Sequence, residues 1–139
     1  MAWFLVKSEP SVWSWDQMKA AGKKGTHWNG VRNHQAAIHL KAMAIGDTCF
    51  FYHSNEERQI VGIVEVIKTA YPDPSDETGR FVMVDVRALK AVPKPVTLAA
   101  IKAEPELADL SLVRQSRLSV MAIDDASAQI LLKMGGVLK

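Results

Sequence analysis

Residues 28–35, with the sequence WNGVRNHQ, combine side chains that suit the binding of a planar, polar ligand. A tryptophan stands beside asparagine amides, an arginine, a histidine and a glutamine, and Gly30 frees the backbone between them. An aromatic face provides stacking, while amides donate and accept hydrogen bonds along a ligand's edge. The same composition also fits a core tryptophan followed by a helix N-cap, so this stretch alone leaves both interpretations open.

Within this stretch each polar residue has a binding role and an ordinary alternative. We expect Trp28 to be a stacking platform, with a core tryptophan as the alternative, and we expect the other three tryptophans to belong to the core. Asn29 and Asn33 can pair with the edge of a base, although an N-cap is the commoner role for Asn33. Arg32 can hold a flanking phosphate with its two-pronged guanidinium, and a surface salt bridge is the alternative.

A second polar group, Lys7-Ser8-Glu9, follows the apolar run at residues 3–6 and is stopped by Pro10. At the end of a buried strand, Lys7 and Ser8 can donate to a base carbonyl or a phosphate. Glu9 can accept from an exocyclic amine. The competing interpretation is a buried ion pair between Lys7 and Glu9.

Two later strands supply further candidates. In the aromatic segment 48–54, Tyr52 and Ser54 share one face and can line one cavity, while His53 points to the other face. A tyrosine that simply fills the core, with its hydroxyl hydrogen-bonded, is the alternative for Tyr52. Arg117 and Ser119 also share a face and can close the pocket from the C-terminal side.

Hydrophobic periodicity and capping residues predict the elements that carry these side chains. Helices are expected after Ser14, whose spacing to Gln17 is that of a capping box, after Asn33, after Thr97, and after Asp124 or Asp125. The Asn33 helix should run to Met43. The expected strands cover residues 3–6, 48–54, 59–69, 80–89 and 117–123.

Other segments connect these elements. Gly62 should mark a bulge or a close backbone approach inside its strand. A polar turn is expected at residues 55–58, a loop at 71–79 and a stiff link at Pro93 and Pro95. The pattern predicts an α+β fold in which a mixed sheet curls into a small barrel with short flanking helices.

Length and composition narrow the function. The 139 residues suit one domain, residues 1–139, and the net charge of +2 is small for a protein that grips many phosphates. No apolar span approaches the ~20 residues of a membrane crossing, and residues 1–7 resemble a strand rather than a signal peptide. The single cysteine, Cys49, allows no disulfide within the chain and fits a small core residue in a reducing, cytoplasmic setting.

Catalytic motifs are weak by comparison. The histidines lack metal-ligand spacing with cysteine or carboxylates, so no metal and no cofactor are expected. His53 and Ser54 are adjacent on a strand and point to opposite faces, which excludes a direct Ser-His pair. A small hydrolase, with Lys7 and Glu9 or Glu65 as its polar groups, is the alternative function.

The sequence resembles the EVE domain over about residues 3–123. The resemblance rests on motifs in the family's order: VKSEP at 6–10, WxGVRN at 28–33, QA at 35–36, GD at 46–47, FFYHSN at 50–55, GI at 62–63, YPDP at 71–74 and RLSV at 117–120. It departs at His34 and Ala37, where many members have tyrosine and arginine. That departure removes a candidate phosphate contact and part of an aromatic wall.

The resemblance implies a PUA-like β-barrel related to the YTH domain, and a non-enzymatic module that recognises a modified base in DNA or RNA. Such bases include methylated or hydroxymethylated cytosine and methyladenine. ASCH-type relatives, which cleave modified nucleosides, are the model for the hydrolase alternative. The sequence leaves open the preferred base, the choice between DNA and RNA, and the oligomeric state. The residues expected to bind the base are Lys7, Ser8, Glu9, Trp28, Asn29, Val31, Arg32, Asn33, Tyr52, Ser54, Asn55, Arg117 and Ser119.

Overall fold

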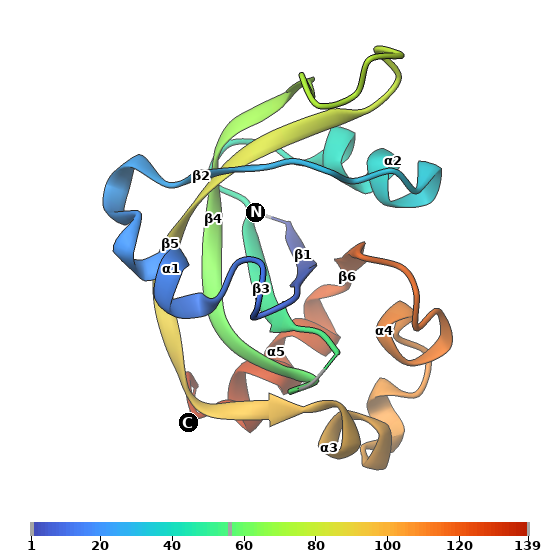
Figure 1. Cartoon of the computed structure of the whole chain (residues 1–139). Coiled ribbons are helices and arrows are strands. Elements are labelled where there is room, and N and C mark those ends of the chain that lie inside the picture. Colours follow the sequence, from blue (N-terminus) through green and yellow to red (C-terminus); the bar gives the residue numbers. More distant parts are fainter. Residues whose placement is uncertain (1, 56, 139) are drawn as a thin grey trace.

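The structure, a computed structural model, describes residues 2–55 and 57–138 and is built around one mixed sheet (Figure 1). Glu56, part of the polar turn expected at 55–58, lies outside the described residues. The strands of the sheet are β1 (Trp3–Ser8), β2 (Thr26–Trp28), β3 (Thr48–His53), β4 (Gln59–Pro72), β5 (Val82–Thr97) and β6 (Val120–Ile123).

The strands are arranged in the order β2-β5-β4-β3-β1-β6. Among the strands that the structure describes, only β1 and β3 pair in parallel, with Trp3 opposite Thr48, and the other neighbours are antiparallel. The long strands β4 and β5 bend along their length (Figure 1). Helix α2 (His34–Ala42) contacts β6, at one edge of the sheet, and also β5 and β4. The predicted α+β fold is confirmed.

Short helices flank this sheet, and their caps are those expected from the sequence. Ser14 forms a complete capping box with Gln17, and the side chains of Asn33, Thr97 and Asp124 each accept the N-cap hydrogen bond of their helix. The remaining helices are α1 (Trp15–Ala20), α3 (Leu98–Ala103), α4 (Ser111–Arg114) and α5 (Asp125–Met134), with 3₁₀ turns at Gly22–Lys24 and Pro105–Leu107.

The strand bounds differ most from the predicted ones in β4, β5 and β6. β4 continues to Pro72, and β6 begins only at Val120. β5 runs through Pro93 and Pro95, which were expected to form a link. The ladder between β4 and β5 shifts register there, from Gly62–Ala91 to Ile60–Val96, so the prolines remove no hydrogen bond from the ladder. β2 was not expected, because three residues carry almost no periodic signal.

The core confirms the close approach expected at Gly62. A Cβ atom at this position would lie 2.4 Å from the Trp15 ring, so only glycine leaves room for the indole. Cys49 is fully buried in the same core, as expected, and burial raises the pKa of its thiol. None of the helices in the described ranges is long and apolar enough to cross a membrane.

Candidate functional site

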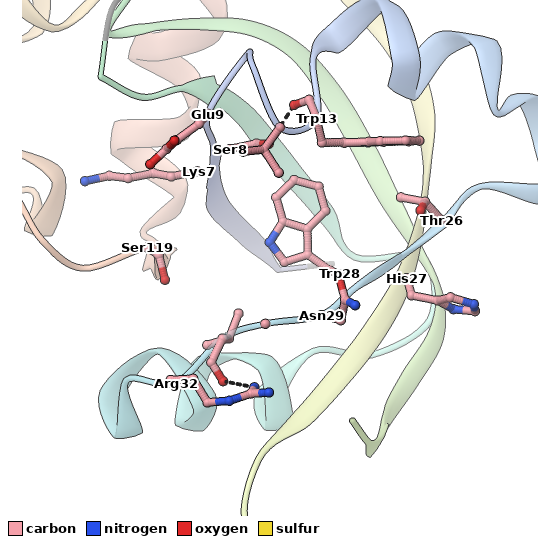
Figure 2. A pocket seen from close by; sticks show the side chains of 13 residues that line it. Lys7, Ser8, Glu9, Trp13, Thr26, His27, Trp28, Asn29, Arg32 and Ser119 are labelled. Atoms are coloured by element: carbon pink, nitrogen blue, oxygen red, sulfur yellow. Dashed lines mark hydrogen bonds between the residues drawn. The ribbon is translucent and has the colours of Figure 1, made fainter. Parts of the chain in front are cut away.

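A cavity of about 480 Å³ opens beside β2 and holds most of the predicted binding residues (Figure 2). Its walls come from the end of β1, the turn before α1, β2 with the segment after it, and the residue before β6. Its lining residues are Lys7, Ser8, Glu9, Val12, Trp13, Thr26, His27, Trp28, Asn29, Gly30, Val31, Arg32 and Ser119. The volume falls in the range of small-molecule sites.

Trp28 belongs to the core and to the cavity at once. Its side chain is only 8% exposed and meets Phe51 edge-on, with 5.6 Å between the ring centroids. Strand β2 positions it, because Trp28 pairs with Val84 and shares a face with Thr26. Figure 2 shows the indole projecting from β2 toward the loop that carries Ser8 and Trp13. The two interpretations of Trp28 are therefore compatible.

His27 takes the opposite direction. Its Nδ1 lies 2.8 Å from Oδ1 of Asp85, and the hydroxyl of Tyr71 donates to the same oxygen at 2.5 Å. The imidazole points away from Trp28 in Figure 2. Burial and the Asp85 carboxylate together raise the pKa of Tyr71 to about 12, so its hydroxyl stays protonated at neutral pH.

Trp13 is a wall residue that the sequence placed in the core. It is half-buried, packs on the core and also lines the cavity. A tight turn brings it there: the Trp13 N–H donates to the Glu9 carbonyl at 2.9 Å, and the Ser8 hydroxyl donates to the Trp13 carbonyl at 2.6 Å. The Ser8 hydroxyl therefore braces the wall. Pro10 indicates that the strand ends here, but the sequence does not show that the following turn carries Trp13 to the cavity.

Lys7 is one of the basic residues that line the cavity. Its Nζ donates to the carbonyl of Ser116 at 2.9 Å and lies 5.7 Å from the centre of the Tyr52 ring. Among the described residues it forms no ion pair with Glu9, which is exposed. Burial lowers the pKa of the Lys7 ammonium. A hydrogen-bond acceptor brought into the cavity would restore part of the solvation that this ammonium has lost.

Arg32 is held from one side by a buried carboxylate. Its Nη1 lies 3.2 Å from Oδ2 of Asp73, and its Nη2 donates to the Ser75 hydroxyl at 2.9 Å. Asp73 also accepts from the backbone N–H of Gly30. Burial alone would raise the pKa of Asp73, but hydrogen bonds from Ser75, Gly30 and Arg32 lower it to about 2. The salt bridge considered for Arg32 is present.

Five predicted residues do not line the cavity. The Asn33 side chain caps α2 by accepting from the N–H of Ala36 at 2.9 Å. Tyr52 is buried behind Lys7, because the Phe51 face of β3, not the Tyr52 face, packs on Trp28. Ser54 and Asn55 follow the end of β3, where Asn55 adopts φ 66°. Arg117 is exposed in the turn before β6.

The two positions that depart from the family pattern lie outside the cavity as well. The His34 ring packs on Phe81 in a tilted arrangement, with 5.1 Å between the centroids, and Ala37 is buried against the core. Within residues 2–55 and 57–138, no three His, Cys, Asp or Glu side chains gather as they would around a metal ion. What the cavity offers is two indoles, one ammonium and several exposed polar groups at its mouth.

Comparison with known proteins identifies the family. The EVE domain model matches residues 2–134, which is nearly the whole chain. This chain belongs to the EVE domain family. It is similar to human thymocyte nuclear protein 1, with 31% identity over 94% of this chain and 72% of that protein.

Solved structures of similar proteins have the same fold. An NMR structure from Rhodopseudomonas palustris is 56% identical, covers 100% of this chain and 96% of that chain, and gives a TM-score of 0.94. The crystal structure of human THYN1 protein in complex with 5-methylcytosine-containing DNA is 31% identical. It covers 97% of this chain and 98% of that chain and gives a TM-score of 0.89.

A YTH domain from Zygosaccharomyces rouxii, solved with N6-methyladenosine RNA, shares the fold of this EVE domain. It is 17% identical, covers 99% of this chain and 86% of that chain, and gives a TM-score of 0.60. The expected relationship to the YTH fold is confirmed.

Proposed function

We propose that this protein is a non-enzymatic module that binds a modified base of DNA or RNA in the cavity beside Trp28. The observation that carries the proposal is the pair of indoles, Trp13 and Trp28, in a cavity whose other walls present Lys7 and the exposed Asn29. Indole faces can hold a planar ring, and the polar groups can meet its edge.

Relatives support this proposal. Human THYN1 protein, 31% identical to this chain, has been solved with DNA that contains 5-methylcytosine. A base held in the cavity has left its stack, which costs a few kcal/mol. Stacking on an aromatic side chain returns about 1–3 kcal/mol per base. A methyl group adds apolar area, and burying that area against an aromatic wall is favourable. The module should therefore bind a methylated base more tightly than the unmodified base.

The charges around the cavity indicate few phosphate contacts. The chain carries a net charge of only +2, and Arg32 is already engaged by the Asp73 carboxylate. Each phosphate contact steepens the dependence of affinity on salt concentration. We therefore expect a shallow salt dependence, with most of the affinity coming from the cavity itself.

A titration with matched oligonucleotides tests the proposal. The strands carry unmodified, 5-methylated or 5-hydroxymethylated cytosine, or N6-methyladenine, as DNA and as RNA. We expect a preference of about tenfold or more for one modification, equivalent to about 1.4 kcal/mol. Equal affinity for modified and unmodified strands would contradict the proposal.

Matched tryptophan variants tie that preference to the cavity. Trp28→Phe keeps an aromatic ring against Phe51 while reducing the stacking surface. Trp3→Phe is the control, because Trp3 stacks on Phe50 and does not line the cavity. We expect Trp28→Phe to lose most of the preference for the modified strand and Trp3→Phe to keep it.

One observation favours a second candidate, hydrolysis of a modified nucleoside or amide. Lys7 is a lysine with a lowered pKa in a cavity, and such groups serve as nucleophiles or bases in some enzymes. Sustained release of product from a modified nucleoside, lost in Lys7→Met, would establish the hydrolase. Binding without turnover supports the module.

A further inference from the structure

Val12 is an exposed apolar side chain at the mouth of the cavity. It is 70% exposed, as much as any large apolar residue among those that the structure describes, and it lines the cavity. Ile38, Ile45, Leu89 and Leu138 are also exposed, but none of them lines the cavity. An apolar side chain kept in water at a binding site gains free energy when a partner covers it.

The turn that carries Val12 is held rigidly. The N–H groups of Val12 and Trp13 both donate to the Glu9 carbonyl at 2.9 Å, and Pro10 fixes a further backbone torsion between them. The Ser8 hydroxyl closes the turn on the Trp13 carbonyl. Val12 is β-branched and stiff, so it is presented in a defined direction with little freedom left to lose on binding.

Val12 lies between two residues that form walls of the cavity. Glu9 and Trp13, which border the turn, both line the cavity, so a base that enters beside Trp13 leaves its strand next to Val12. A base that leaves a duplex opens a gap between its neighbours and leaves its partner base unpaired. Proteins that bend a duplex often insert an apolar side chain between neighbouring base pairs, which shows that such a side chain is accepted inside the base stack.

We propose that Val12 fills the gap left in a double helix by the extruded base, and that the ligand of this module is a duplex. This inference rests on the proposed function of the cavity. In a single strand no partner base is orphaned and no closed gap has to be filled. The contribution of Val12 should therefore depend on the complementary strand, unlike that of a residue that touches the modified base itself.

The test compares Val12→Ser with the wild type on one modified strand, first alone and then annealed to its complement. Ile45→Ser is the matched control, because Ile45 is also 70% exposed but does not line the cavity. Both side chains lie outside the core, so the variants should remain folded. We expect Val12→Ser to weaken duplex binding about fivefold or more, single-strand binding less than twofold, and Ile45→Ser to change neither.

A fluorescent base analogue placed opposite the modified base gives a second readout. Wild type should enhance its emission less than Val12→Ser does, because the inserted side chain keeps the neighbouring bases stacked. Equal losses on single strand and duplex, or no loss on the duplex, would overturn the inference. So would a wild type that binds the modified single strand but not its duplex, and this result would leave the proposed function intact. If the wild-type protein prefers no modified strand at all, both this inference and the proposed function are wrong.

Discussion

The backbone N–H of Gly30 donates to Oδ2 of Asp73 at 2.8 Å, and this contact joins two segments 43 residues apart in sequence. Gly30 adopts φ 81°, a left-handed conformation that suits glycine. The same carboxylate accepts from Arg32 and from the N–H and hydroxyl of Ser75. The wall segment after Trp28 is therefore anchored to the loop between β4 and β5 before any ligand arrives.

Asp73→Asn should weaken ligand binding about fivefold or more, because an amide cannot accept all of these hydrogen bonds and the wall loses its fixed position. Affinity for the preferred modified strand is the measurement. Asp76→Asn is the control, since Asp76 accepts from Thr78 and Phe81 in the same loop without touching the wall segment. Equal losses in both variants would mean that the loop as a whole, not the Asp73 contact, supports the site.

Stability should decline in acid as Asp73 becomes protonated. Its pKa of about 2 lies below the ordinary value of 3.8, so the contribution is present above about pH 4 and is lost as pH falls toward about 2. The shift corresponds to roughly 2 kcal/mol. Chemical denaturation across this window should show a shallower decline in Asp73→Asn than in wild type. Asp16→Asn, at an exposed carboxylate, should follow wild type.

Lys7→Met should weaken binding about tenfold, because the cavity loses the ammonium that can donate to a base or phosphate oxygen. Burial lowers the pKa of Lys7 from 10.5, so the charged form is lost as pH rises through that lowered value. Wild-type affinity should therefore fall as the pH rises, at a lower pH than for an ordinary lysine side chain, and this fall should be absent in Lys7→Met. Lys19→Met, at an exposed residue paired with Asp16, should keep the wild-type profile.

Gly62→Ala should destabilise the fold by about 2 kcal/mol or more, because its Cβ would lie 2.4 Å from the Trp15 ring in a packed core. Thermal or denaturant unfolding measures the loss. Gly46→Ala is the comparison: a Cβ there meets nothing within 4 Å, and only its φ of 91° opposes the substitution. A smaller loss at Gly62 than at Gly46 would show that the Trp15 packing adapts easily.

Local signals predicted the elements well because they act over a few residues. The capping residues Ser14, Asn33 and Thr97 each correctly predicted the start of a helix. An N-cap hydrogen bond spans only two or three positions, so its residues can be recognised in the local sequence. Gly62 was identified because glycine inside an apolar strand needs a packing reason. β2 was missed because three residues show no period.

The composition of the site was only partly predictable. Trp28 and Lys7 were found from their unusual neighbours, but Tyr52 was assigned to the cavity because strand alternation does not say which face meets it. Trp13 was taken for a core residue, since only the folded turn shows that it also forms a wall. The anchoring role of Asp73 was invisible, because no local pattern connects it to Gly30.

The four tryptophans supply the most direct test of the central claim. Trp13 and Trp28 line the cavity, whereas Trp3 and Trp15 do not, so their indole N–H resonances report separately on the cavity and on the remaining core. The measurement is a ¹⁵N NMR titration with one modified strand and its unmodified counterpart. We predict that the modified strand shifts the Trp13 and Trp28 resonances and leaves Trp3 and Trp15 nearly unchanged, while the unmodified strand shifts the cavity pair far less. Identical shifts with both strands, or shifts confined to Trp3 and Trp15, would contradict binding of a modified base in this cavity.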